Sequence, residues 1–441
     1  MKMSVFYLNA IAHGKSDSET EMNVFLPQDL DARAEVMNLS TTMHNIMSSQ
    51  STKNIICITQ DALLASYLMT KNENEISRDR FFDICMKGDG WSTKHILDRL
   101  EWIQTVSKSN GITLPMYCGK NLISMMLPAN FDYTKKNDAR KDQPTVRIVK
   151  GVMLEGALTK ANLGQGHNTL IHVLHKEYGM EKAIDFINNI QFIGNQYLLH
   201  FSFSIGIQDC LAKSTKRIED IAYRCFIEAK DTEASISHPA IRELKISAIL
   251  DKARDMSLKI SKDDLAGGQN GYVDTVTSGS KGEYFNITQM SGMLGQQNHM
   301  GKRIQNTYNR GKRTLPHYPI HDQTMEQEFE SHGFIKSSFL RGLNPQEFIF
   351  HSITGREGIA NSSQSTASSG YTQRKMVKVM EDIQVKYDGT VRNTNDWIFQ
   401  WNYGGDGFDR TYCSFKNGDV CFADVHQIAS RLNNDYEAQS F

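Results

Sequence analysis

The sequence predicts an α+β protein that contains several structural units. Three observations support this class: a length of 441 residues, short apolar runs between polar turns in the first half, and helical spacing of apolar residues in the second half. A chain of this length can bury several cores, so two to four units are expected. The hydrophobic fraction of 39% and the charged fraction of 22% are those of an ordinary globular protein.

The first 130 residues open with an apolar segment. Residues 1–40 continue through an acidic, Ser-rich loop into a predicted helix that starts at Asp29. Residues 41–130 mix polar turns with short apolar runs such as Ile55–Ile58 and Leu122–Leu127. This mixture predicts an α+β region with short strands.

The middle of the chain changes from strands to helices. Residues 130–144 are predicted to be a charged surface loop, and residues 145–210 are predicted to be short strands and turns. Residues 212–264 carry apolar side chains three and four positions apart, with a break between two helices at His238-Pro239. Residues 267–282 hold five glycines and are predicted to be a loop region.

One long helix is predicted in the segment from Asn344 to Asn393. Asn344 suits the N-cap, Pro345 suits the first helical position, and Glu347 stands where a capping-box carboxylate reaches back. Asp388-Gly389 provides the expected stop, and Met376 and Met380 keep the helical spacing before it.

The centre of this predicted helix has no large apolar side chain. Residues 361–370 read Asn-Ser-Ser-Gln-Ser-Thr-Ala-Ser-Ser-Gly, and Arg374, Lys375 and Lys378 follow. Composition alone favours a flexible loop between two helices, because Ser and Thr each cost up to about 0.7 kcal/mol against Ala in a helix. The alternative is a helix that is kept slim so that a base pair can approach it, with hydroxyl groups for phosphates.

Charge, cysteine and histidine patterns exclude several other classes. Lys+Arg (49) nearly cancels Asp+Glu (50), so any nucleic-acid contact must come from local patches. The seven cysteines form no C-x-x-C pair, which argues against a disulfide framework and a cysteine zinc site. His167, His172 and His175 are expected to be structural rather than zinc ligands, since no cysteine lies near them. No apolar run approaches the ~20 residues of a membrane span, and the apolar start is shorter than a signal peptide core.

The segment after Asn344 resembles the bridge helix of the largest subunit of multisubunit RNA polymerases. The residues that carry the resemblance run from Phe348 to Ile359, then through Thr366-Ala367 and Ser369–Lys375, and on to Tyr403–Gly407. In that family the bridge helix crosses the cleft beside the active centre, and its Thr-Ala pair faces the template base. The resemblance therefore implies a nucleic-acid-binding set: Thr366, Ala367, Gly370, Tyr371, Arg374 and Lys375.

Two upstream regions extend the resemblance. Gly279-Ser-Lys-Gly282, Asn286–Met290 and Gly295-Gln-Gln297 resemble the funnel that admits nucleotides. A glycine-flanked lysine suits a triphosphate, although Lys281 alone would be read as a solvated loop lysine. The resemblance implies these residues for the nucleotide or substrate channel: Asn9, Lys281, Gln289, Gln296 and Gln297.

The pore region of the same family resembles residues that include Gln60–Leu63 and Gly119–Ile123. Four divisions follow from the whole resemblance: residues 1–40 end the active-site domain, 41–210 form the pore domain, 211–335 form the funnel, and 336–441 hold the bridge helix and the start of the cleft region. Only a middle portion of the largest subunit is covered, so we expect relatives among split or partial subunits of large DNA viruses such as invertebrate iridoviruses.

The metal site of the family is degenerate in this sequence. The family's Asn-Ala-Asp-Phe-Asp-Gly-Asp holds the catalytic Mg²⁺, and the similar stretch here places Ile11, His13 and Lys15 at the aspartate positions. Isoleucine cannot coordinate, lysine repels the cation, and histidine is a poor Mg²⁺ ligand. Asp17, Glu19 and Glu21 are expected to be a solvated acidic loop rather than substitutes. The chain is thus expected to bind no metal or other cofactor, with Mg²⁺ held by the assembled polymerase.

Two functions remain open from the sequence. The first is a subunit of a viral DNA-directed RNA polymerase that is inactive alone. Its partners would be the second-largest subunit, the remainder of the largest subunit, template DNA, RNA and nucleoside triphosphates, with no membrane. Its place would be inside the host cell, in cytoplasm or nucleus, or packaged in the virion. The second is a non-catalytic paralogue that binds polymerase or nucleic acid as a regulator.

Overall fold

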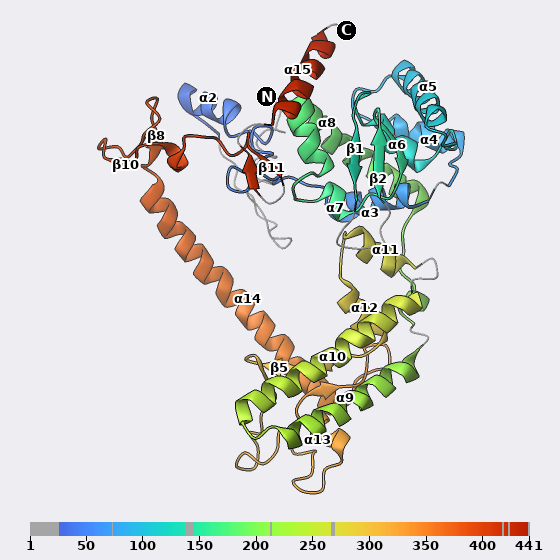
Figure 1. Cartoon of the computed structure of the whole chain (residues 1–441), viewed down its shortest axis with the longest axis vertical. Helices are drawn as coiled ribbons and strands as arrows, with labels where there is room; N and C mark the ends of the chain where they lie inside the picture. The colour runs from blue at the N-terminus through green and yellow to red at the C-terminus, as the bar shows by residue number, and fades with distance from the viewer. Residues whose placement is uncertain are drawn as a thin grey trace. The chain divides into compact units, whose positions relative to one another are not determined.

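The computed structural model describes residues 26–72, 74–136, 145–211, 214–265, 270–416, 419–421 and 424–439. These residues divide into two compact units (Figure 1). The first contains residues up to 203, residues 277–281 and residues from 402 onward, and the second contains residues 204–276 and 282–401. The mixture of helices with small sheets confirms the predicted α+β class.

The first unit is mainly helical, with a small antiparallel sheet. Its elements in chain order are α2 (Leu30–Asn38), α3 (Gln60–Lys71), α4 (Arg78–Cys85), α5 (Thr93–Ser109), α6 (Gly119–Met125), β1 (Tyr133–Lys135), β2 (Val146–Val149), β3 (Val152–Glu155), α7 (Lys160–Leu163), α8 (Leu170–Phe201), η2 (Tyr403–Gly405), β11 (Ser414–Lys416), β12 (Asp419–Cys421) and α15 (Val425–Gln439).

One hydrophobic core joins most of these elements. The strands pair in the order β1-β2-β3, α5 and α6 pack on β3, and α8 packs against both α3 and α15. Buried Arg99 on α5 ties the core loops together, because its guanidinium donates to the carbonyls of Ser124, Leu127 and Gly151 at 3.0, 2.8 and 3.2 Å. Three satisfied carbonyls allow a charged group to be buried there without a carboxylate.

The second unit is built around two long helices. Its elements are η1 (Ile207–Cys210), α9 (Thr215–Ser235), α10 (Pro239–Leu265), most of α11 (Gly271–Ser278), α12 (Tyr284–Ser291), β4 (Gly295–Gln296), β5 (Asn298–His299), β6 (Lys302–Arg303), α13 (Met325–Ser331), β7 (Phe334–Ile335), α14 (Pro345–Met380), β8 (Gln384–Val385), β9 (Val391–Arg392) and β10 (Ile398–Gln400).

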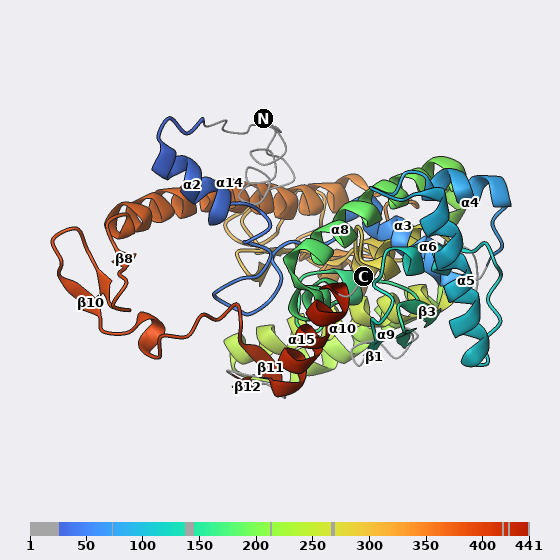
Figure 2. The same cartoon turned by 90° about the horizontal axis from the view of Figure 1, so that it is seen from above.

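The core of this unit lies between α9 and α10. Phe226 of α9 stacks on Phe329 of α13 with ring centroids 5.0 Å apart, and meets Phe334 of β7 edge-on at 4.9 Å. Strand β4, which pairs antiparallel with β7, packs against α10. From this base α14 extends as one uninterrupted helix to the small sheet β10-β9-β8 (Figures 1 and 2).

Several sequence predictions are confirmed and several are wrong. The helix after Asp29, the break at His238-Pro239 and the long helix after Asn344 are confirmed. The alternative of a loop at residues 361–370 is wrong, because α14 is continuous through them. Asp388-Gly389 does not end the helix; it lies in the turn that joins β8 to β9, and α14 ends at Met380.

Four further predictions of strands or loops differ from the structure. The described residues between 41 and 130 form four helices and no strand longer than an isolated bridge, and the apolar run Leu122–Leu127 falls largely within α6. Residues 145–210 contain the long α8, which bends at Gly179, where φ is +85°. The glycine-rich region 267–282 contains α11, and strand β1 lies in the predicted loop 130–144. Among the described residues, no helix is long and apolar enough to cross a bilayer.

Candidate nucleic-acid interface

The base of α14 is packed into the second unit by its first two turns. Phe350 is 1% exposed, and its ring stacks on Tyr318 with centroids 6.3 Å apart, beside Ile304. The backbone N–H of Asn344 donates to the Glu347 carboxylate at 2.9 Å, as a capping box requires. The helix is therefore anchored at its N-terminal end, and it begins where the Asn-Pro-Gln-Glu motif predicts a helix start.

A second attachment holds the next two turns. Thr354 donates its hydroxyl to the carbonyl of Asn298 at 3.0 Å, and the Glu357 carboxylate accepts from the backbone N–H of Met300 at 3.0 Å. The same carboxylate lies 2.8 Å from Nδ1 of His299. The Met300 N–H, and then His299, hold the pKa of Glu357 below its ordinary value. The β5–β6 hairpin thus fixes the direction in which α14 leaves the unit.

Beyond this attachment α14 is exposed within its unit. All residues from 358 to 380 are exposed, including apolar Ile359, Met376 and Val379. An α-helix turns by about 100° per residue, so the predicted nucleic-acid residues lie on one side of it, within an arc of about 180°. In order around that arc they are Thr366, Gly370, Arg374, Ala367, Tyr371 and Lys375.

The glycines of α14 have no packing role in the described structure. A Cβ added at Gly355, Gly358 or Gly370 would meet no described atom within 4 Å, apart from the local backbone of the helix. Glycine inside a helix costs about 0.5–1 kcal/mol relative to alanine. Among the described residues, no neighbouring side chain therefore requires glycine at position 370.

Two predicted residues contact each other on this side. The ammonium of Lys375 lies 4.0 Å from the centroid of the Tyr371 ring, which is a cation–π contact. Tyr371 is 61% exposed, so its other face remains accessible. Thr366 donates its hydroxyl to the carbonyl of Ser362 at 2.9 Å, within its own helix. The hydroxyl hydrogen of Thr366 is therefore used within the helix, while the side chain as a whole is exposed.

The three predicted channel glutamines lie at different depths. Gln296 is buried, and its amide donates to the carbonyls of Gln297 and His332 at 2.8 and 2.9 Å. Gln297 is also buried, with Oε1 3.3 Å from Nδ1 of His351 on α14. Gln289 is half-buried on α12. Of the two buried glutamines, Gln297 is the one with a side-chain hydrogen bond to α14 in the described structure.

Lys281 is exposed in the turn between α11 and α12. Gly279 and Gly282 flank the turn with φ of +78° and +72°, a conformation that favours glycine. Gly279 also lies against Lys160, since an added Cβ would come within 2.6 Å of the Lys160 Cβ. The tight turn therefore fixes the backbone that carries Lys281 while its side chain stays at the surface.

The predicted metal-loop stretch falls near the N-terminus of the sequence. Asn9, Ile11, His13 and Lys15 lie outside the described residues, as do the acidic residues that follow them. In the described ranges, no group of three or more His, Cys, Asp or Glu side chains is placed to hold a metal ion. The side chains of Ile11, His13 and Lys15 offer no oxygen ligand of the kind that Mg²⁺ prefers.

The predicted structural role of the histidines in α8 has direct support at one position. His172 is 2% exposed, and its Nε2 lies 3.1 Å from the carbonyl oxygen of Thr52. Burial, with smaller contributions from nearby cations, lowers the pKa of His172 to about 4.

Sequence reasoning missed the residues that attach α14. His351, Thr354 and Glu357 are spaced three apart, so they fall on neighbouring turns of one side of the helix. That spacing was visible in the sequence. Their partners on the hairpin were not, because they come from more than fifty positions upstream.

Comparison with known families agrees with this arrangement. Three family models match consecutive parts of the chain: RNA polymerase Rpb1 domain 3 at residues 45–210, domain 4 at residues 228–335 and domain 5 at residues 342–429. The chain belongs to the family of RNA polymerase largest subunits and corresponds to their middle portion. The predicted family is confirmed.

Individual relatives show how much of a largest subunit this chain matches. The chain is 38% identical over 440 residues to the probable DNA-directed RNA polymerase II subunit RPB1 homolog of Invertebrate iridescent virus 6. The match covers 95% of this chain and 42% of that protein. Identity to the DNA-directed RNA polymerase II subunits RPB1-A and RPB1-B of Trypanosoma brucei brucei is 31% over 405 residues, which is 88% of this chain and 22% of each relative. The chain thus spans less than half of the length of these relatives.

Proposed function

We propose that this chain is a subunit of a viral DNA-directed RNA polymerase and that α14 serves as its bridge helix. The observation that carries the proposal is the exposed, slim middle of α14 in a chain that matches three consecutive domains of the largest subunit. The Ser and Gly residues in the middle of α14 make the helix less stable than alanine would. Close approach of the template to this part of the helix would explain why they are there. The proposed partners are the second-largest subunit, the remainder of the largest subunit, template DNA and RNA.

The residues of α14 would position the template. Thr366 and Ala367 present a methyl-sized surface to a base pair, while Arg374 and Lys375 attract the phosphate backbone. The proposed channel role of Lys281 is electrostatic, since a mobile lysine attracts the triphosphate of an incoming nucleotide. Gln297 would act through His351 as a positioning residue.

The catalytic Mg²⁺ of the assembled polymerase would be held by another polypeptide, because Ile11, His13 and Lys15 do not fit the ion. The isolated chain is expected to show no Mg²⁺-dependent nucleotide addition on a primed template. Clear activity of the purified chain, abolished by EDTA and retained after a further purification step, would contradict this proposal. The proposed location is inside the host cell, in cytoplasm or nucleus, or in the virion.

A non-catalytic paralogue is the second candidate, and the replaced aspartates favour it. Purification of the active polymerase from its source, followed by mass spectrometry, separates the two. A subunit should appear in every active fraction at a constant ratio to the second-largest subunit. A regulator should appear in a variable ratio or be removable without loss of activity, and absence from all active fractions would refute the subunit proposal.

A further inference from the structure

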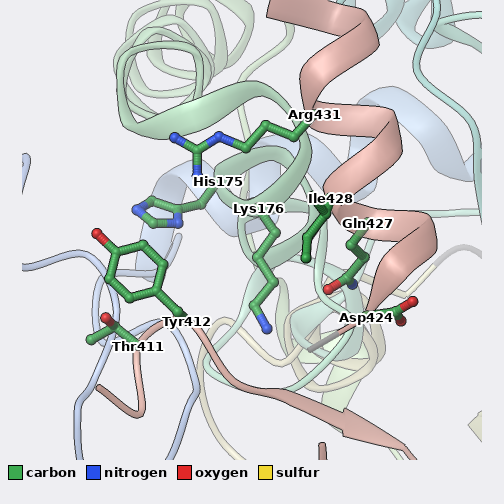
Figure 3. A pocket seen from close by; sticks show the side chains of 8 residues that line it. All are labelled: His175, Lys176, Thr411, Tyr412, Asp424, Gln427, Ile428 and Arg431. Carbon is green, nitrogen blue, oxygen red and sulfur yellow. The ribbon is translucent and has the colours of Figure 1, made fainter. Parts of the chain in front are cut away.

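A cavity in the first unit has no part in the proposed function. Its volume is about 210 Å³, and its walls come from α8, a turn before β11 and the start of α15 (Figure 3). The lining residues are His175, Lys176, Thr411, Tyr412, Asp424, Gln427, Ile428 and Arg431. A water molecule needs about 10–15 Å³ of this cavity volume, so the cavity can hold more than ten waters. It is therefore large enough for a small organic ion.

Two cations enter this cavity from different elements. Lys176 comes from α8 and Arg431 from α15, and Figure 3 shows Arg431 reaching over His175 while Lys176 points between the turn and Gln427. Lys176 donates to the carbonyl oxygen of Cys413, which holds its ammonium at the wall. Burial lowers the pKa of Lys176, so the protein pays a desolvation cost to keep this charge there.

The surroundings are electropositive. Burial and the charges of Arg431 and Lys176 lower the pKa of His175 to about 4, so its imidazole is neutral near pH 7. The pKa of His167 is also lowered, by burial and then by Lys53 and Lys176 among its neighbours. One carboxylate, that of Asp424, lines the cavity and opposes the cations.

We propose that this cavity binds a small phosphate-bearing anion. Arg431 and Lys176 would hold the phosphate, because a guanidinium fork and an ammonium are the usual pair for that group. Thr411, Tyr412 and Gln427 supply neutral donors around it. Tyr412 and Ile428 are exposed at the rim, where they would cover any apolar part of the ligand.

Asp424 allows a sharp test. Its carboxylate accepts from the backbone N–H of His426 at 3.2 Å at the start of α15. Asn caps a helix about as well as Asp. Asp424→Asn therefore removes the opposing charge and keeps the cap, so it should tighten anion binding by several-fold without unfolding α15.

Binding is measured by isothermal titration calorimetry of the full chain with inorganic phosphate and with pyrophosphate at low salt. Arg431→Gln and Lys176→Gln should each weaken binding by about ten-fold or more, as expected for loss of a charge-assisted contact. The control is Lys182→Gln, an exposed lysine elsewhere on α8 that pairs with Asp185 at 3.9 Å, and it should leave affinity unchanged.

Three results would overturn the proposal. One is the absence of saturable binding of either probe at concentrations up to about 10 mM. Another is binding that Lys182→Gln weakens as much as Arg431→Gln, since that would indicate attraction to the whole surface. The third is binding of an oligoglutamate peptide with no binding of phosphate or pyrophosphate, which would assign the cavity to an acidic protein partner. Circular dichroism melts of each variant show that a lost affinity does not reflect unfolding.

Discussion

Gly370→Ala is expected to stabilise the isolated chain and to impair the assembled polymerase. The position is exposed, and an added Cβ meets no described atom within 4 Å apart from the local backbone of α14. Alanine should therefore gain about 0.5–1 kcal/mol of local helix stability. That gain corresponds to about two- to five-fold slower amide exchange in this part of α14, since 1.4 kcal/mol is a factor of about ten.

The same methyl group would occupy the surface that we assign to the template. Hydrogen exchange measured by mass spectrometry on residues 361–375 tests the first effect, and the elongation rate of reconstituted polymerase tests the second. Gly358→Ala is the matched control, because Gly358 is equally open but points about 120° away around the helix. Faster exchange in Gly370→Ala would refute the stability reasoning. Equal elongation rates for wild type and both variants would refute the interface.

Three further outcomes test the attachment and charge of α14. Phe350→Ala should destabilise the second unit by about 3–5 kcal/mol in urea unfolding, because Phe350 is buried against Tyr318; a cost below about 1 kcal/mol would contradict the packing. The pKa of Glu357 lies below its ordinary value of 4.5, so the ionised carboxylate stabilises the folded state. This stabilisation is present above pH 4.5 and is lost as the carboxylate becomes protonated at lower pH. Glu357→Gln should remove this part of the acid dependence, and an unchanged pH profile of unfolding would count against it. Arg374→Gln should lower the salt dependence of polymerase binding to template by about one ion, measured by fluorescence anisotropy against KCl, and an unchanged slope would exclude a phosphate contact.

The helix α14 was predictable from sequence because its signals are local. Asn344, Pro345 and Glu347 define the start, and the structure uses that cap. Composition alone favoured a loop in the polar middle, since the Ser and Gly residues there weaken a helix. Only the resemblance to a bridge helix favoured one continuous helix through these residues, and α14 is continuous in the structure.

Other elements were hidden because their signals are not local. The helix α8 is apolar on several sides and bends at Gly179, so its Ile, Leu and Phe residues look like short strands. The turn at Asp388-Gly389 has the same residues as a helix stop, and only the pairing of β8 with β9 distinguishes them. The hydrogen bonds from the β5–β6 hairpin to Glu357 likewise join distant parts of the sequence.

The proposed bridge-helix role requires α14 to contact the template through the slim segment 361–370. A photo-crosslinking amino acid placed at Ala367 in a transcribing polymerase tests it directly, with the same probe at Ser365 as the control. Ser365 is equally exposed but lies about 160° away around the helix. We expect a crosslink to the template strand from position 367 and much less from position 365. Equal crosslinking from both positions, or none from position 367 in complexes that still extend RNA, would contradict it.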